Sequence, residues 1–191
     1  MRPAVFLDRD GTIIEERGYL DRLDLLELFP WTVDAIRLVN RAGFAAVVIT
    51  NQSAIGRGII DEPFLHRVHE AIDARMAAGR ARIDAYYFCP HHPDADLEAY
   101  RQTCRCRKPQ PGLIERACRE LQLDPSRSVM VGDKPSDLEV APRVGARSVL
   151  VLTGYGLGEW EYRRDRFRIT PDHVASDLLD AVEWALKERP S

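Results

Sequence analysis

Two carboxylates directly follow the first apolar run of the chain, and a glycine directly follows them. The run is residues 4–7, and it leads into Asp8, Asp10 and Gly11. A short apolar run bounded by turn residues predicts a buried strand. Ligands of an open parallel α/β sheet bind at the carboxyl ends of its strands, so paired carboxylates there indicate a cation and a phosphate. The alternative is a solvated turn, which Asp and Gly commonly make.

Apolar strands and amphipathic helices are predicted to alternate along the whole chain. The expected strands are residues 4–8, 44–50, 85–88, 128–132 and 147–152, with a short edge strand at Val174-Ala175. The expected helices are residues 32–41, 62–78, 111–121, 136–144 and 177–188. This alternation implies an α/β fold with right-handed crossovers and a doubly wound parallel sheet. The 191 residues, 45% of them hydrophobic, suffice for one core, so a single domain over 1–191 is expected.

Polar side chains are also predicted at the ends of later strands and in the connection between them. They are Thr50, Asn51, Gln52 and Ser53 after the second strand, Arg107 and Lys108 ahead of Pro109, and Asp133, Lys134 and Asp137 after the fourth strand. Small polar groups and cations at such positions suit the oxygens of a phosphoryl group. Asp137 has a simpler alternative, because the dipole of the following helix stabilises a carboxylate at its N-terminus.

These residues together predict phosphoryl transfer, which asks a protein mainly to position groups and to neutralise charge. Asp8 is expected to act as the nucleophile and to form an aspartyl-phosphate. Asp10 is expected to protonate the leaving alkoxide and then to deprotonate the hydrolytic water. Asp133 would complete a Mg²⁺ site with Asp8 and the backbone carbonyl of Asp10, because Mg²⁺ prefers hard oxygen ligands. Thr50 and Lys108 would hold the phosphoryl oxygens.

Three cysteines and a histidine form a second pattern, a C-x-H pair and a C-x-C pair joined by a polar connection. Cys89, His91, Cys104 and Cys106 offer three sulfurs and an imidazole, which suit a tetrahedral structural Zn²⁺. A disulfide or unrelated free thiols are the alternatives, and the absence of a recognisable secretory segment disfavours a disulfide.

The residues around this pattern extend the prediction. Arg107 and Lys108 follow the last cysteine, so a bound metal would fix the backbone that aims both cations at the phosphate. His92, next to His91, is the alternative fourth ligand. Cys118 lies in an amphipathic helical pattern and is expected in the core.

The order of these motifs resembles a known superfamily. DxD, Thr, Lys and GDxxxD, in that order from Asp8 to Asp137, are similar to the four motifs of the haloacid dehalogenase phosphotransferases. A narrower resemblance, to the D-glycero-D-manno-heptose 1,7-bisphosphate 7-phosphatases, covers nearly the whole chain. It is carried by Thr50-Asn51-Gln52-Ser53, Cys89-Pro90-His91-His92-Pro93, Cys104-Arg105-Cys106-Arg107-Lys108-Pro109 and Val131-Gly132-Asp133-Lys134.

The resemblance implies a haloacid dehalogenase-like Rossmannoid fold with a zinc-binding loop at 89–106 and no separate cap domain. It implies a Mg²⁺-dependent phosphatase that removes the 7-phosphate in the synthesis of ADP- or GDP-heptose and of lipopolysaccharide core precursors. It favours His91 over His92 as the zinc ligand, and it makes Asp137 a carboxylate that steadies Lys108 or the Mg²⁺ site. Ala54 departs from the pattern, because many members have glycine there.

The histidinol-phosphate phosphatases of histidine biosynthesis are the alternative within the superfamily. They share the zinc loop and the catalytic set, but they typically have Asp in the place of Ser53, Arg in the place of Lys134 and a shorter zinc loop. Those differences favour the heptose enzymes.

With no cap domain, substrate choice is expected to lie in short loops over the phosphate site. The candidate substrate-binding residues are Glu16, Arg17, Gly18, Tyr19, Asn51, Gln52, Ser53, Arg107 and Lys134. Arg107 could make a bidentate contact to a second phosphate or to sugar hydroxyls. For Glu16 and Arg17 the alternative is a solvated loop.

Composition disfavours other classes of function. The net charge of -3 gives no basic field for nucleic acid, and a zinc-dependent nucleic-acid module would interleave aromatic with basic residues. No window approaches the roughly 18 apolar residues of a membrane span, so a cytoplasmic protein is expected. The resemblance implies a small phosphorylated sugar as the substrate, and a monomer is expected. A phospho-accepting signalling domain is a further alternative. Asp10 opposes it, because a carboxyl beyond the nucleophile accelerates hydrolysis of the acyl phosphate.

Overall fold

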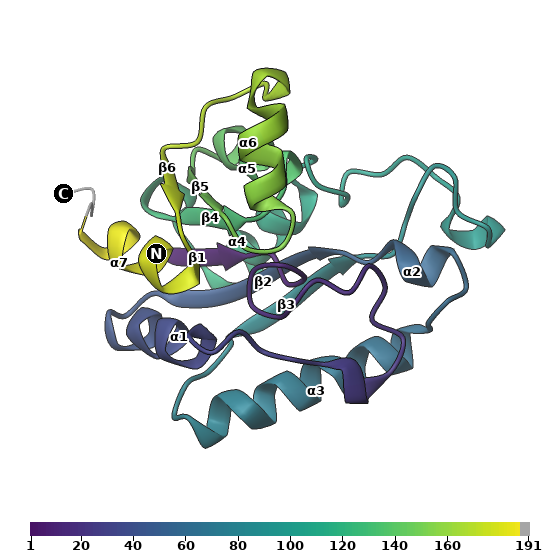
Figure 1. Cartoon of the computed structure of the whole chain (residues 1–191), viewed down its shortest axis with the longest axis horizontal. Coiled ribbons are helices and arrows are strands. Elements are labelled where there is room, and N and C mark those ends of the chain that lie inside the picture. The colour runs from purple at the N-terminus through teal and green to yellow at the C-terminus, as the bar shows by residue number, and fades with distance from the viewer. Residues whose placement is uncertain (188–191) are drawn as a thin grey trace.

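One six-stranded parallel sheet forms the centre of the computed structural model, which describes residues 1–187 (Figure 1). The strands lie in the order β3-β2-β1-β4-β5-β6. Their bounds are Ala4–Leu7 (β1), Ala45–Asn51 (β2), Ala85–Cys89 (β3), Val129–Gly132 (β4), Arg147–Val151 (β5) and His173–Ala175 (β6). The predicted doubly wound sheet is therefore confirmed, and β6 is the predicted edge strand.

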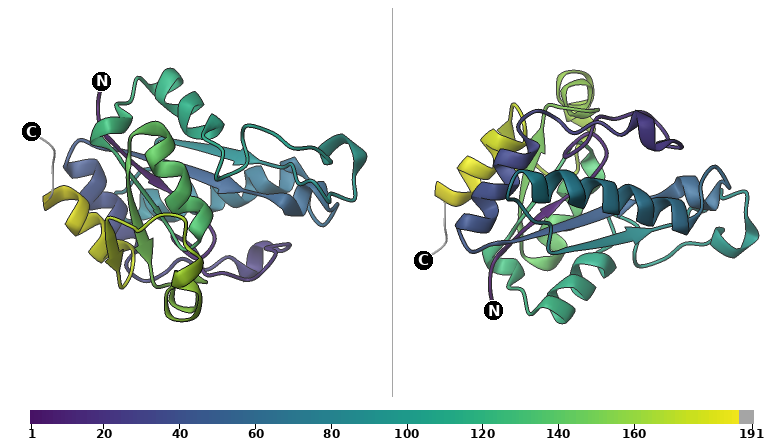
Figure 2. Two further views of the ribbon diagram at one scale, coloured as in Figure 1. Left: turned by 90° about the horizontal axis from the view of Figure 1, so that it is seen from above. Right: turned by 90° about the horizontal axis from the view of Figure 1, so that it is seen from below.

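Helices cover both faces of the sheet (Figures 1 and 2). On one face lie α1 (Thr32–Arg41), α3 (Glu62–Ala78) and α7 (Leu178–Lys187), and on the other lie α4 (Gly112–Leu121) and α5 (Pro135–Val144). The predicted end of the last helix, residue 188, lies outside the described residues. None of the helices within residues 1–187 is long and apolar enough to cross a membrane.

Two short helices were not predicted. Residues 53–57 were expected in a loop, but α2 (Ser53–Gly56) begins there, and α6 (Gly156–Arg163) follows β5. A four-residue helix is too short to show helical periodicity, and the two glycines of α6 lower its intrinsic helix propensity. The predicted strand start at residue 44 was also early by one residue, because β2 begins at Ala45.

The central strand β1 is buried on both faces. Val5 and Leu7 belong to the core with α1, α3 and α7, whereas Ala4 and Phe6 belong to the core with α4 and α5. All four residues have no exposed surface. Burial on both faces explains why this strand appears in the sequence as an uninterrupted apolar run rather than as an alternation.

The register of the sheet brings distant polar residues to one edge. Leu7 of β1 pairs with Val48 of β2 and with Val131 of β4. The residues that follow these three therefore emerge side by side at the carboxyl edge. Two long connections, residues 8–31 and 90–111, leave from this edge, and each holds only one short 3-10 turn.

Candidate active site

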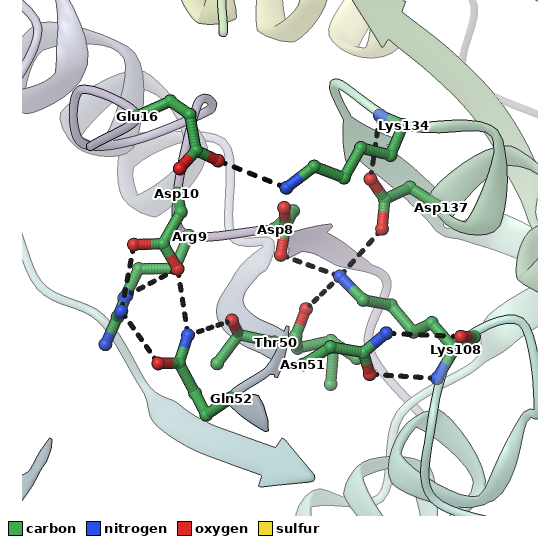
Figure 3. A network of polar contacts seen from close by, with 11 residues as sticks. Asp8, Arg9, Asp10, Glu16, Thr50, Asn51, Gln52, Lys108, Lys134 and Asp137 are labelled. Atoms are coloured by element: carbon green, nitrogen blue, oxygen red, sulfur yellow. Dashed lines mark hydrogen bonds and ion pairs between the residues drawn. The ribbon is translucent and has the colours of Figure 1, made fainter. Parts of the chain in front are cut away.

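A buried lysine bridges two buried carboxylates at the carboxyl edge of the sheet (Figure 3). Nζ of Lys108 lies 2.7 Å from Oδ1 of Asp8 and 2.7 Å from Oδ1 of Asp137, and it donates to the carbonyl oxygen of Ile49 at 2.6 Å. Burial alone would lower the pKa of Lys108, but the charges of Asp137 and Asp8 outweigh it and raise the pKa. The ammonium group therefore stays protonated beside the proposed nucleophile.

The Asn51 side chain fixes the backbone of this lysine. Its Nδ2 donates to the carbonyl oxygen of Lys108 at 3.1 Å, and its Oδ1 accepts from the amide of Lys108 at 3.0 Å. Asn51 was predicted to contact substrate, yet both ends of its amide are used to hold the chain that carries Lys108. It also lines the cleft above the site.

Asp137 serves both of the roles that the sequence left open. Its Oδ1 pairs with Lys108, and its Oδ2 accepts from the backbone amide of Lys134 at 3.0 Å, at the N-terminus of α5. One carboxylate thus caps the helix and holds the lysine. Burial raises the pKa of Asp137 to about 6, although the neighbouring charge of Lys108 lowers it.

Asp10 is held by a second network, which Figure 3 shows to the side of Asp8. Its carboxylate accepts two hydrogen bonds from Arg9 and one from Nε2 of Gln52 at 2.8 Å. The same Gln52 nitrogen donates to Oγ1 of Thr50 at 2.8 Å. Burial alone would raise the pKa of Asp10, but the charge and hydrogen bonds of Arg9 outweigh it and lower the pKa.

Three buried carboxylates form a group that could hold a cation. Oxygen atoms of Asp8, Asp133 and Asp137 lie within 4.8 Å of one another. Among the described residues Oδ1 of Asp133 has no hydrogen-bond partner, while Oδ2 accepts from the amide of Tyr155 at 2.9 Å. Burial and the charge of Asp8 raise the pKa of Asp133 to about 8. Clustered oxygen ligands with one buried orphan atom fit Mg²⁺, whose charge would relieve this repulsion.

Two glycines make room for Asp133. Gly11 has φ +84°, and a Cβ there would collide with Oδ2 of Asp133. A Cβ on Gly154, which has φ +56°, would collide with the same oxygen. The glycine that follows the paired carboxylates is thus required both by its left-handed backbone and by close approach to the acidic group.

Lys134 provides a second cation above the acidic group. Its Nζ lies 3.1 Å from Oε2 of Glu16 and 4.7 Å from the ring centre of Tyr155. Burial alone would lower its pKa, but the charges of Asp8, Asp133 and Glu16 outweigh it and raise the pKa. Lys134 therefore stays charged at the mouth of the site.

Asp10, Lys108 and Lys134 line a cleft of about 490 Å³. Asp8 and Asp137 line a smaller pocket that shares these three residues. Most of the predicted substrate-binding residues line the larger cleft, namely Glu16, Gly18, Tyr19, Asn51, Gln52, Ser53, Arg107 and Lys134. Arg17 does not line this cleft, because it pairs with Glu15 and Glu27 on the far side of its loop. Arg9, Ser136 and Tyr155 line the cleft but were not predicted.

The predicted cysteine and histidine ligands lie together in the connection after β3. Sγ of Cys106 lies 3.1 Å from Sγ of Cys89, 3.1 Å from Sγ of Cys104 and 3.2 Å from Nδ1 of His91. All the cysteines are free thiols. Metal–sulfur bonds of about 2.3 Å place tetrahedral ligands less than about 4 Å apart, so this donor set fits Zn²⁺. Burial raises the pKa of the Cys89 thiol.

His92 and Cys118 lie outside this group of possible metal ligands. The group of possible metal ligands contains His91 and not His92, whose Nδ1 accepts from the amide of Asp94 at 3.0 Å. Cys118, a residue of α4, was expected in the core. It is only partly buried, because it packs at the margin of the core between α4 and the sheet.

The cysteine loop contacts both sides of the cleft. Nη1 of Arg107 donates to the carbonyl oxygen of His91 at 3.1 Å. The amide of Leu97 donates to the carbonyl oxygen of Gly56 in α2 at 2.9 Å, and a Cβ on Gly56 would lie 2.9 Å from the carbonyl oxygen of Pro90. Order in this loop therefore supports α2 as well as the segment that carries Lys108.

Proteins with a similar sequence match this chain over most of its length. A family profile described as HAD-hydrolase-like matches residues 105–181. The D-glycero-beta-D-manno-heptose-1,7-bisphosphate 7-phosphatase of Escherichia coli K12 is 45% identical over 154 residues, which are 80% of this chain and 80% of that protein. The D-glycero-D-manno-heptose-1,7-bisphosphate 7-phosphatase of Thermosynechococcus vestitus is 40% identical over 189 residues, 96% of this chain and 95% of that protein. The chain belongs to this phosphatase family.

Solved structures agree with this family. The D,D-heptose 1,7-bisphosphate phosphatase from B. bronchiseptica, complexed with magnesium and phosphate, superposes with a TM-score of 0.85 at 29% identity and covers 97% of this chain and 99% of its own. The D,D-heptose 1,7-bisphosphate phosphatase from Burkholderia thailandensis has a TM-score of 0.71 at 28% identity, covering 98% and 100% of the two chains. The protein is thus a phosphatase of the haloacid dehalogenase superfamily, and the predicted fold is confirmed.

Arg9 is the main residue of this site that sequence reasoning missed. It stands between the two predicted catalytic carboxylates, and its side chain is 2% exposed. A charged residue directly after an apolar strand is usually assigned to solvent. The signal that could have found it is its place between Asp8 and Asp10, because a cation next to carboxylates can be buried when it is paired with one of them.

The raised pKa of Asp133 generates a prediction about stability. Because the folded-state value of about 8 exceeds the ordinary 3.8, protonated Asp133 stabilises the fold at low pH, and this contribution is lost as the pH rises towards 8. Asn imitates the protonated acid, so without Mg²⁺ Asp133→Asn should become progressively more stable than wild type between about pH 5 and pH 8. Urea unfolding at several pH values measures this difference. Asp21→Asn, at an exposed loop position, is the control, and a pH-independent difference for Asp133→Asn would contradict the prediction.

Proposed function

We propose that this chain hydrolyses the 7-phosphate of D-glycero-D-manno-heptose 1,7-bisphosphate through an aspartyl-phosphate on Asp8. The observation that carries the proposal is the Asp8–Lys108–Asp137 triad beside Asp133, at the base of a cleft with further cations at its mouth. The printed names of relatives with 40% to 45% identity support the sugar. No feature of the site favours histidinol phosphate.

In the first half of the proposed reaction, a carboxylate oxygen of Asp8 attacks phosphorus and the bond from phosphorus to the sugar oxygen breaks. Asp10 enters this step protonated and gives that proton to the leaving oxygen. In the second half, Asp10 takes a proton from water as the water attacks phosphorus, and the bond from Asp8 to phosphorus breaks. This regenerates the Asp8 carboxylate and releases inorganic phosphate. Asp10 lines the cleft, as this role requires.

The transferring phosphoryl group is held, in this proposal, by Lys108 and Thr50. Lys108 is preorganised by its two carboxylates and by the Asn51 clasp, so it needs no reorganisation when charge develops. Oγ1 of Thr50 is placed by its hydrogen bond from Gln52. Fixed donors of this kind stabilise the transition state more effectively than mobile ones.

Asp8, Asp133 and the backbone carbonyl of Asp10 would hold the catalytic Mg²⁺. The ion would screen the repulsion between the anionic nucleophile and the anionic phosphate when bound. The magnesium in the B. bronchiseptica structure supports this assignment. Cys89, His91, Cys104 and Cys106 would hold a structural Zn²⁺, with no open position for chemistry.

Arg107 and Lys134 are proposed to bind the phosphate that is not transferred, while Glu16, Gly18, Tyr19 and Ser53 contact the sugar. Both cations lie at the cleft, and Lys134 already pairs with Glu16. The proposal includes a single-domain enzyme that works as a monomer, since one chain would suffice to form this site. Three closely spaced free thiols suit the reducing cytoplasm.

The proposal predicts a preference among substrates and a loss of turnover in Asp8→Asn. Wild type should hydrolyse heptose 1,7-bisphosphate with a higher kcat/KM than histidinol phosphate or simple sugar phosphates. Asp8→Asn should lower turnover on every substrate by about 10⁴-fold or more, because the amide keeps the shape but is no longer an anionic nucleophile. Phosphate release by purified protein, with folding checked by circular dichroism, measures both. Substantial turnover by Asp8→Asn, or a preference for histidinol phosphate, would refute the proposal.

Arg107→Ala should lower kcat/KM for the bisphosphate by roughly tenfold or more, with a smaller loss for a sugar monophosphate. The reason is that only the bisphosphate loses binding energy at the remote phosphate. The matched control is Arg105→Ala, since the Arg105 side chain is 79% exposed and pairs with Glu115 outside the cleft. Equal losses on both substrates would place Arg107 at the transferred phosphate instead.

The zinc proposal predicts about one Zn²⁺ per chain that survives dialysis removing Mg²⁺, because thiolates hold zinc far more tightly than carboxylates hold magnesium. Cys106→Ser should lose the metal, unfold at lower temperature and show lower activity, since the cysteine loop supports α2 and Lys108. Elemental analysis and thermal unfolding measure this. Cys118→Ser, outside the cluster, should keep its zinc. A zinc-free Cys106→Ser with unchanged stability and kinetics would refute the coupling.

A further inference from the structure

Arg9 is a buried arginine without an evident structural reason for its charge. It is among the largest fully buried side chains of the described residues. Burying a guanidinium group is costly unless it is paired, and an apolar side chain of similar volume usually fills such a space at no cost to stability. Within residues 1–187 Asp10 is the only carboxylate with which Arg9 forms an ion pair. The charge of Arg9 is therefore directed at Asp10.

The contact between the two residues is a two-point clamp. Nε of Arg9 donates to Oδ2 of Asp10 at 3.1 Å, and Nη2 donates to Oδ1 at 2.9 Å. A planar guanidinium group that engages both oxygens fixes the plane of the carboxylate as well as its position. Lysine offers a charge without this fork.

Gln52 closes the clamp. Its Oε1 accepts from Nη2 of Arg9 at 2.9 Å, and its Nε2 donates to Oδ2 of Asp10 at 2.8 Å. The third contact of Gln52, to Oγ1 of Thr50, ties the clamp to β2. Arg9, Gln52 and Asp10 thus form a closed ring of hydrogen bonds, which Figure 3 shows beside Asp8.

Two stacked rings, those of His69 and Tyr86, lie near Arg9. His69 of α3 is 6% exposed and stacks on Tyr86 of β3, with ring centres 4.2 Å apart. Tyr86 in turn donates to Asp73 at 2.7 Å. Burial and the nearby charge of Arg9 lower the pKa of His69 to about 3, so His69 adds no second positive charge. Neither ring competes with Asp10 as the ion-pair partner of the Arg9 guanidinium group.

We propose that Arg9, braced by Gln52, is a positioning residue that fixes the Asp10 carboxylate for proton transfer to the leaving oxygen and from water. The inference rests on the proposed acid/base role of Asp10. Without the clamp, the Asp10 carboxylate is free to rotate, and a misplacement of about 1 Å can cost on the order of 10²-fold in rate. Attack by Asp8 does not depend on the clamp, because Lys108 holds Asp8 separately.

Because Asp8 and Asp10 are held by different residues, a kinetic test can measure the two halves of the reaction separately. Nitrophenolate leaves without a proton, so 4-nitrophenyl phosphate needs Asp10 only when water attacks the aspartyl-phosphate. Arg9→Met should therefore release about one equivalent of nitrophenolate rapidly and then turn over roughly 100-fold more slowly than wild type. On heptose 1,7-bisphosphate even the first turnover should slow by roughly 100-fold, because the alkoxide needs the Asp10 proton. Rapid-mixing absorbance and quenched single-turnover assays measure these phases.

Further variants separate positioning from general damage to the fold. Arg9→Lys should restore part of the steady-state rate, since it returns the charge but not the fork. Gln52→Leu should show a weaker burst of the same kind and serves if Arg9→Met does not fold. Arg147→Met is the matched control. It removes a half-buried arginine at the amino end of β5, whose guanidinium group lies 4.8 Å from the ring centre of Trp184, and it should show no burst.

With 4-nitrophenyl phosphate, a loss of equal size in the first and later turnovers, without a burst, would overturn the inference, and so would wild-type kinetics on both substrates. Asp8→Asn, measured in the same assay, distinguishes this from failure of the proposed function. Nitrophenolate release by Asp8→Asn would show that Asp8 is not the nucleophile, whatever Arg9→Met does.

Discussion

The buried ammonium group of Lys108 is the interaction on which the rest of the site depends. It lies between Asp8 of the central strand and Asp137 of α5, so it joins three segments that are far apart in the sequence. Removing one partner of such a buried ion pair typically costs about 3–5 kcal/mol, because the remaining charges stay buried and unpaired. The Asn51 clasp holds the lysine backbone in the place that this pairing requires.

The acidic group carries more negative than positive charge, because β1 and β4 are both followed by carboxylates. Asp8, Asp133 and Asp137 bring three carboxylates together, and Lys108 offers one positive charge among them. The raised pKa of Asp133, to about 8, is the consequence of burial beside Asp8. A divalent cation relieves this excess and allows an anionic phosphate to approach an anionic nucleophile. The close approach of these carboxylates, which raises the pKa of Asp133, therefore also forms the proposed Mg²⁺ site.

Two supports outside the charged cluster hold it in shape. The cysteine loop contacts α2 through Gly56 and contacts Arg107 through the carbonyl of His91, so a metal bound there would order both walls of the cleft. On the opposite side the Arg9 clamp holds Asp10. The proposed nucleophile, Asp8, and the proposed acid/base, Asp10, are thus held by separate partners, which allows each to be perturbed alone. This independence is what makes the two halves of the reaction experimentally separable.

The sequence by itself determined the parallel sheet, the positions of Asp8 and Asp133 at strand ends and the pattern of cysteines and histidines in the cysteine loop, because apolar runs and residue spacing are local. Tertiary structure alone decided which polar groups meet. The Asn51 clasp joins residues 57 positions apart, and Arg17 turns out of the cleft towards Glu27. Arg9 looks like a solvated charge in the sequence, yet burial makes it the clamp of its neighbour. Side-chain partners depend on sheet register and on the desolvation of charge, and neither is present until the chain has folded.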